Sequence, residues 1–254
     1  MPVSDPTTRF SDRVDNYVRY RPGYPHAVLE LLRRECGLTP DAIVADIASG
    51  TGLLTRMFLD NGNRVFAVEP NPEMRQAGER LLADYHKFVS VAGSAENTSL
   101  ADHTIDFVTA AQAAHWFDPP KARREFVRIL KPGGWCMLIW NDRRTDSSPF
   151  LRAYEQLLLT YGTDYKQVSH EHFSGNIDCF FAPSKFSTHF FEMRQEFDYP
   201  GLEGRLLSSS YAPLEGHADY EPMLKQLRAI FEEFKVEGKV AFEYNTGVYY
   251  GKLA

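Results

Sequence analysis

Cysteine is scarce in this chain of 254 residues, which holds only Cys36, Cys136 and Cys179. The three are far apart in the sequence, and none belongs to a CxxC pair or to a zinc-ligand spacing. This scarcity excludes a disulfide framework and a cysteine-based metal site. It favours a reducing compartment, the cytoplasm.

Long apolar runs and an excess of positive charge are also missing. Nowhere do about 18 apolar residues follow one another, so we expect no membrane-spanning helix, and the first residues do not form a signal peptide. Acidic residues outnumber basic ones by 34 to 28, a net charge of −6 that opposes binding to a nucleic-acid backbone. We therefore expect a soluble, untargeted protein whose partner is a small molecule, with no nucleic acid and no membrane.

The length and the 43% hydrophobic content are enough for one sizeable core. No repeat, low-complexity tract or linker divides the chain, so we predict one domain over residues 1–254. Within it we expect an N-terminal cap at 1–41, a ligand-binding core at 42–141, and substrate-covering insertions with a terminal strand pair at 142–254. The sequence leaves monomer and homodimer open.

Strand-like and helix-like segments alternate along the core, as is typical of a parallel sheet covered by helices on both faces. The predicted strands are 43–48, 65–68, 88–92, 105–110 and 135–140. The predicted helices are 26–36, 53–60, 72–85 and 119–130. After residue 141 the pattern loosens into helices at 150–161, 202–209 and 220–234 and strand-like segments at 186–197 and 240–252.

The turn after the first predicted strand carries the most information. Asp46 lies near the end of an apolar run, and the small residues Ala48, Gly50 and Gly52 follow at alternate positions. Such residues let the backbone turn sharply and let a ligand approach the main chain. The next strand ends on Glu69, where a carboxylate in a doubly wound sheet accepts hydrogen bonds from ribose hydroxyls. The combination predicts a cofactor that contains adenosine.

The same turn differs from the G-x-G-x-x-G pattern of dinucleotide binders. Asp46 would repel a pyrophosphate, and Leu53 follows where that pattern continues, so a ligand with an amine and a sulfonium fits better. The D-x-A-x-G-x-G spacing resembles the first motif of class I S-adenosylmethionine (SAM) dependent methyltransferases, with Ala48 in place of the first glycine. An NAD(P)-dependent oxidoreductase is the less favoured alternative.

Two further segments carry this resemblance. Tyr-Arg-Pro-Gly-Tyr-Pro at 20–25 and Gln-Ala-Ala-His-Trp-Phe at 112–117 are similar to a small-molecule subgroup that includes trans-aconitate methyltransferase-like proteins. The matches span residues 17–140 and recur weakly at 244–253. The resemblance implies an α/β fold with a Rossmann-like, doubly wound, seven-stranded and mainly parallel sheet, an antiparallel last strand, and helical insertions over the carboxyl edge.

The resemblance also implies a site for SAM, which becomes S-adenosylhomocysteine after transfer. Carried over by position, Asp46 lies near the methionine amine and Glu69 on the ribose diol. Arg21 covers the site and meets the methionine carboxylate, with a plain surface arginine as the alternative. The other implied cofactor positions are Tyr20, Ala48, Gly50, Gly52, Asn71, Met74, Ser94, Ala95, Glu96, Ala111, Gln112 and Trp116.

His115 is the one candidate catalytic residue. Methyl transfer from a sulfonium depends mainly on alignment, and a base helps only when the acceptor must lose a proton. A carboxylic acid, one candidate for the small-molecule acceptor, is already ionised at neutral pH and needs none. The alternative for His115 is that it packs the loop with Trp116. The alternative for the protein is a non-catalytic SAM-binding function.

Three other signals are interpreted as structural. Asp118, followed by two prolines, predicts a helix N-cap rather than the base-binding motif of nucleic-acid methyltransferases. The run His-Glu-His at 170–172 fits no standard metal-ligand spacing, so we expect no metal. Arg143 and Arg144 are expected as exposed loop charges, with binding of an acidic substrate as the alternative.

Overall fold

The computed structural model describes residues 14–165, 177, 178 and 180–253. Within them one sheet of seven strands has the order β3-β2-β1-β4-β5-β7-β6. The neighbours from β3 to β5 pair in parallel, whereas β7 is antiparallel to both β5 and β6. The predicted fold class is confirmed. The strands are β1 (Ile43–Ile47), β2 (Arg64–Val68), β3 (Phe88–Val91), β4 (Ile105–Ala111), β5 (Leu130–Arg143), β6 (Phe186–Phe197) and β7 (Val240–Gly251).

The helices follow the predicted segments closely. α2 ends before Gly37, whose backbone is left-handed with φ of 69°. No helix in the described part of the chain is long and apolar enough to cross a bilayer. The main helices are α1 (Val14–Tyr20), α2 (Ala27–Cys36), α3 (Leu53–Asp60), α4 (Pro72–Leu81), α5 (Pro119–Ile129), α6 (Pro149–Tyr161), α9 (Tyr199–Leu207) and α10 (Tyr220–Phe234).

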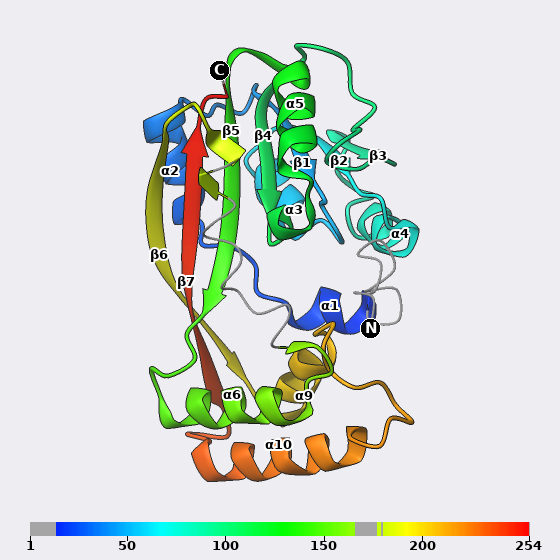
Figure 1. Cartoon of the computed structure of the whole chain (residues 1–254), viewed down its shortest axis with the longest axis vertical. Helices are drawn as coiled ribbons and strands as arrows, with labels where there is room; N and C mark the ends of the chain where they lie inside the picture. Colours follow the sequence, from blue (N-terminus) through cyan, green and yellow to red (C-terminus); the bar gives the residue numbers. More distant parts are fainter. Residues whose placement is uncertain (1–13, 166–176, 179, 254) are drawn as a thin grey trace.

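Both faces of the sheet are buried because successive strand residues point to opposite sides. On β4, Phe107 belongs to the core beneath α2 and α3, whereas its neighbour Val108 belongs to the core beneath α5. Figure 1 shows these helices on the two sides of the sheet. This explains the nearly continuous apolar strands in the sequence.

A third layer lies at the carboxyl ends of the parallel strands. It consists of α6, α9, α10 and the adjoining ends of β6 and β7, and it is called the lower layer after its place in Figure 1. β6 and β7 are 12 residues long and extend beyond the ends of the parallel strands β1 to β4. There Phe242 and Tyr244 pack with α6, α9 and α10. Figure 1 shows α1 between this layer and the sheet. The predicted insertions over the carboxyl edge are thus confirmed, and they form one wall of the site.

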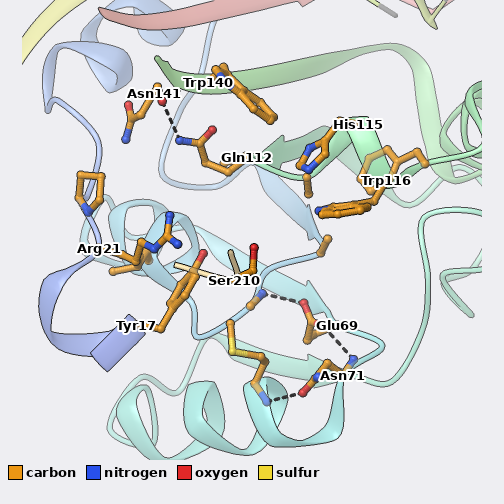
Figure 2. Close-up of a pocket in the computed structure, with 18 of the residues that line it drawn as sticks. Tyr17, Arg21, Glu69, Asn71, Gln112, His115, Trp116, Trp140, Asn141 and Ser210 are labelled. Atoms are coloured by element: carbon orange, nitrogen blue, oxygen red, sulfur yellow. Dashed lines mark hydrogen bonds between the residues drawn. The ribbon is translucent and has the colours of Figure 1, made fainter. Parts of the chain in front are cut away.

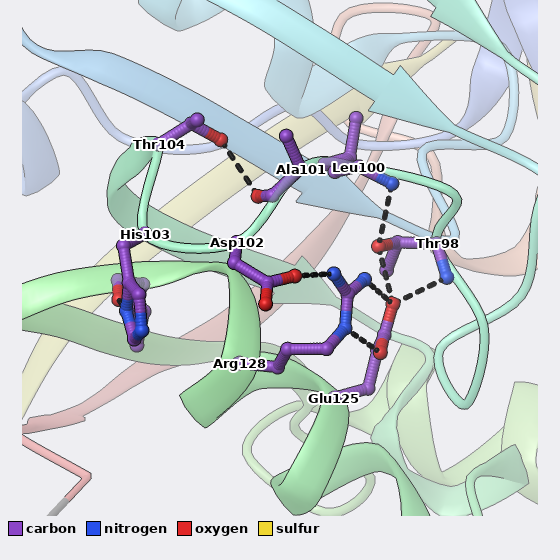
Figure 3. A network of polar contacts seen from close by, with 9 residues as sticks. Thr98, Leu100, Ala101, Asp102, His103, Thr104, Glu125 and Arg128 are labelled. Atoms are coloured by element: carbon purple, nitrogen blue, oxygen red, sulfur yellow. Dashed lines mark hydrogen bonds and ion pairs between the residues drawn. The ribbon is translucent and has the colours of Figure 1, made fainter.

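The loop after β3 is fastened to α5 by a buried carboxylate (Figure 3). Glu125 accepts hydrogen bonds from the N–H and hydroxyl of Thr98, at 2.8 and 2.6 Å. It also accepts two from Arg128, at 2.8 and 2.7 Å, and Arg128 contacts Asp102 as well. The Arg128 hydrogen bonds, opposed by burial and aided by Thr98, lower the pKa of Glu125 to about 2. The network therefore stabilises the fold while Glu125 is ionised.

Glu125→Gln is expected to lower the free energy of unfolding by about 2 kcal/mol at pH 7, because Arg128 and Thr98 lose a charged acceptor. The folded pKa lies below the ordinary 4.5, so this contribution is present above that pH and is lost as the pH falls toward 2. Urea unfolding at pH 7 and pH 3 measures it. The difference between the two proteins should shrink by about half or more at pH 3, and a difference that is independent of pH would contradict this account.

Candidate functional site

A cavity of about 290 Å³ opens at the carboxyl ends of β1, β2 and β4. In Figure 2, Glu69 and Asn71 lie on one wall, His115 and Trp116 on a second, and Arg21 on a third. The structure brings most of the predicted site residues together here. Those that line the cavity are Arg21, Ala48, Gly50, Glu69, Asn71, Met74, Ser94, Ala95, Glu96, Ala111, Gln112, His115 and Trp116.

Three predicted residues lie outside the cavity lining. The Asp46 carboxylate is buried and accepts hydrogen bonds from the hydroxyls of Thr55 and Thr109, at 2.6 and 3.2 Å. Burial raises the pKa of Asp46 to about 7, against the two hydroxyl bonds. Asp46 therefore fastens β1 to α3 and β4, and its contact with a cofactor amine stays a prediction.

Tyr20 and Gly52 hold neighbouring elements in place. A side chain at Gly204 on α9 would overlap the Tyr20 ring, so Tyr20 fastens α1 to the lower layer. Gly52 has φ of 87°, and a Cβ there would lie 2.6 Å from Leu82 Cδ1. Only glycine permits this start of α3 beside Leu82. Their predicted contacts with a cofactor also remain predictions.

The turn itself has an unusual backbone. Ala48 adopts φ of 55°, a left-handed conformation that alanine disfavours, and Gly50 follows with φ of 58°. Ala48 occupies the position where the motif usually has glycine. The substitution noted in the sequence therefore leaves the turn intact and introduces local strain.

Glu69 joins this turn to the end of β2. Its carboxylate accepts hydrogen bonds from the Gly50 N–H and the Asn71 N–H, each at 2.8 Å. Burial raises the pKa of Glu69, and these two backbone bonds act against that rise. Asn71 in turn caps α4 by accepting the Met74 N–H at 2.8 Å. The carboxylate is thus fixed in the cavity wall with further lone pairs for a ligand.

Gln112 and Arg21 offer complementary polar atoms. Gln112 has a left-handed φ of 57° and donates to the Asn141 carbonyl at 3.1 Å, while its Oε1 is buried without a partner among the described residues. Arg21 donates to the Ser208 carbonyl at 2.9 Å, and within the same described part its Nε is buried without a partner. An open acceptor and an open donor suit the ammonium and carboxylate of an amino acid.

His115 lies in the cavity wall on the turn after β4. Its ring is 4.3 Å from the Trp116 ring and 5.1 Å from the Trp140 ring, measured between centroids. The indoles hold the imidazole in place, as the packing interpretation predicts. The ring also lines the cavity, and its catalytic role stays a prediction.

The expectation of an exposed charge was wrong for Arg143, whereas Arg144 is exposed as expected. Arg143 is 7% exposed, lines the cavity, and pairs with Glu155 and with the Tyr165 hydroxyl at 3.0 Å. The Arg144 side chain is 40% exposed and meets only surface acids, at 3.7 and 3.8 Å, among its described ion pairs. β5 runs to Arg143 instead of ending near 140, so strand alternation past Asn141 is the signal that identifies the buried arginine.

Several further residues that line the cavity were not predicted from the sequence. They come from α1 and the loop after it, the end of β5, the lower layer and β7, and no short motif links them. They include Tyr17, Pro22, Tyr24, Trp140, Asn141, Tyr165, Arg205, Ser210, Tyr211 and Tyr244.

Asp118 is the N-cap of α5 and accepts the Lys121 N–H at 3.2 Å, which confirms the capping prediction. Across the residues that the structure describes, no cluster of His, Cys, Asp and Glu could hold a metal. The run 170–172 and Cys179 lie outside the described residues, whereas Cys36 and Cys136 are buried free thiols.

The parallel-sheet part of the chain matches known proteins. Residues 45–138 match the family described as "Methyltransferase domain". Over these residues the chain is similar to class I SAM-dependent methyltransferases. An uncharacterized methyltransferase of Mycobacterium bovis is 38% identical over 139 residues, which cover 55% of this chain and 54% of the relative. The chain thus spans about half the length of the curated relatives it matches first.

Solved structures share the methyltransferase fold. A protein of Anaeromyxobacter dehalogenans assigned as a type II methyltransferase has a TM-score of 0.68 and 21% identity, covering 92% of this chain and 98% of its own. A Haemonchus contortus N-methyltransferase, solved with S-adenosylhomocysteine and phosphomonomethylethanolamine, has a TM-score of 0.50 and 14% identity, covering 96% and 57%. At these identities the likeness concerns the fold alone.

Ala48→Gly is expected to raise the free energy of unfolding by about 0.5 kcal/mol, because the relieved left-handed strain exceeds the entropy that glycine loses. Ala48→Val should lower it by more than about 1 kcal/mol, since a β-branched residue tolerates this φ least. Urea unfolding measures both. Ala45→Gly, in the middle of β1, is the matched control and should destabilise. Equal stability of the glycine and valine variants at position 48 would contradict the strain.

Proposed function

We propose that this protein transfers a methyl group from SAM to a small-molecule acceptor held in the cavity. The observation that carries the proposal is the Glu69 carboxylate, fixed by the Gly50 and Asn71 N–H groups at the end of β2. It suits the ribose diol of the donor. Gln112 Oε1 and the Arg21 guanidinium suit its ammonium and carboxylate.

The remaining cofactor positions follow from the cavity lining. Ala48 and Gly50 expose main chain to the ligand, and Met74 lies beside Gly50. The segment 94–96 borders the adenine position in this proposal, with Trp116 at the aromatic wall. The bound donor supplies an activated methyl group, so the task of the chain is to align the two reactants and exclude water.

The part of the cavity that the lower layer lines favours an enzyme over a non-catalytic binding protein. The lower layer closes the cavity with Tyr165, Arg205 and Tyr211, which lie outside the matched residues 45–138. A protein that only binds the cofactor has no need of this second, polar half. A screen of small acids, alcohols and amines with methyl-labelled SAM separates the two functions, and we expect labelled product from the acids.

Glu69→Ala is expected to weaken SAM binding at least tenfold, because each ribose hydroxyl loses a charged hydrogen-bond acceptor worth about 1.5 kcal/mol or more. Titration calorimetry with SAM and with S-adenosylhomocysteine measures the loss. Glu79→Ala is the matched control, since this acid lies on α4 with a side chain 45% exposed. Glu69→Gln, which keeps one carbonyl oxygen, should give an intermediate affinity. Undiminished affinity in Glu69→Ala would remove the ribose contact.

His115→Ala is expected to lower kcat by about 100-fold or more if the imidazole accepts a proton from the acceptor, with SAM affinity changed little. His115→Phe keeps a ring against Trp116 but cannot take a proton. Stopped assays with the acceptor found in the screen give kcat and KM for both variants. Near-normal turnover in His115→Phe would leave His115 only its packing role.

A further inference from the structure

The polar half of the cavity is dominated by arginine. Arg143 at the end of β5 and Arg205 on α9 are 7% and 5% exposed, and Arg21 reaches the same cavity from the loop after α1. Arg143 pairs in register with Tyr244 of β7, so two cavity residues lie side by side across the sheet. These side chains come from separate elements and converge on one space.

Two of these three guanidinium groups have no carboxylate partner among the described residues. Arg143 has Glu155 as its carboxylate partner, but within the described residues no ion pair involves Arg21 or Arg205. Arg205 donates to the Ser209 hydroxyl at 3.2 Å and lies 5.8 Å from the Phe242 ring centre. Burying a guanidinium without an anionic partner costs folding free energy. The arrangement therefore points to a ligand that supplies the negative charge.

Open hydrogen-bond donors are found on the same side chains. Arg143 Nη1 and Arg205 Nε are buried and have no hydrogen-bond partner in the part of the chain that the structure describes. Both residues line the cavity. Guanidinium N–H groups are donors only, and their planar fork matches a carboxylate or a phosphate.

Nearby groups also respond to the positive charge. Burial raises the pKa of the Tyr211 phenol, but Arg205, Arg143 and Arg21 outweigh burial and lower it. Burial and the charge of Arg205 both lower the pKa of Arg21. The three guanidinium charges therefore act on the same small volume.

We propose that Arg143 and Arg205 form a subsite that binds an acidic group of the methyl acceptor. This inference rests on the proposed function and deepens it, with Arg21 assigned to the carboxylate of the donor. The shared chemistry is an oxyanion, carried as a carboxylate or as a phosphate ester. Binding satisfies the two open donors and gives Arg205 an anionic partner.

The subsite also restricts the atom that is methylated. Oxygens held by guanidinium groups have their lone pairs engaged, so the bound oxyanion is a poor nucleophile. The acceptor must then carry a second nucleophilic group. In the transfer, a lone pair of that group forms the bond to the methyl carbon, while the carbon–sulfur bond breaks and its electron pair stays on sulfur. A second carboxylate has no proton to lose, and a hydroxyl passes its proton to a base or to water.

The test is calorimetry on the full chain saturated with S-adenosylhomocysteine. The probes are C4 to C8 dicarboxylates and aromatic hydroxy acids, each beside its neutral methyl ester, and phenyl phosphate for the phosphate arm. Acids should bind and esters should not. Arg205→Gln should weaken binding of the acids by about 30-fold or more, because a buried charged contact is lost. The arm that binds more tightly identifies the oxyanion.

Matched variants separate recognition from folding. Arg144→Gln, the exposed neighbour of Arg143, should bind the acids as the parent protein does. Arg205→Lys keeps the charge but loses the fork, so an intermediate loss is expected. Because Arg143→Gln alone leaves Glu155 without its cation, Arg143→Gln combined with Glu155→Gln tests that arginine. Thermal melting and an unchanged affinity for S-adenosylhomocysteine show that each variant is folded.

The outcomes distinguish the two proposals. If the parent protein does not bind S-adenosylhomocysteine, the proposed function fails. If it binds that ligand but none of the acids, or if Arg205→Gln binds the acids as tightly as the parent, only the arginine subsite is overturned. Labelled product from a tightly bound acid should retain one negative charge on anion exchange, and a neutral product would also overturn the subsite.

Discussion

The carboxylate of Glu69 is the contact on which the site depends. By accepting the N–H groups of Gly50 and Asn71, it joins the turn after β1 to the start of α4. Burial of a carboxylate is tolerable here because backbone donors meet it on both oxygens. The same bonds fix the wall on which an adenosine ligand would lie. The left-handed Ala48 and Gln112 are held near this rigid edge, where strain is expected at functional positions.

The cavity is lined on one side by the ends of the parallel strands and on the other by the lower layer. Short parallel strands and their turns build the half that is similar to methyltransferase domains, within residues 45–138. The long strands β5, β6 and β7 extend past the ends of the other strands. Together with α9 they position the second half of the cavity lining. Arg143 and Arg205 reach the cavity only because these strands and this helix pack together. In the proposed function, the cofactor therefore binds to the parallel strands and the acceptor is recognised by the lower layer.

The sequence predicted the first half well because its residues follow strand ends, where position along the chain determines position in space. Glu69, Gln112 and His115 were found in this way and all line the cavity. Asp46 has the spacing of the motif, yet its oxygens face two threonines, which a spacing cannot reveal. Arg205 was missed, since its meeting with Arg143 depends on tertiary packing between distant segments.

The central claim is that this cavity binds SAM through its ribose and amino-acid ends and leaves an arginine-lined space beside the sulfur. A crystal structure of the full chain with S-adenosylhomocysteine tests it most directly. We expect the ribose hydroxyls on Glu69, the amino-acid end at Gln112 and Arg21, and free volume next to Arg143 and Arg205. A ligand bound elsewhere, or an adenosyl group that fills the arginine end, would contradict the account.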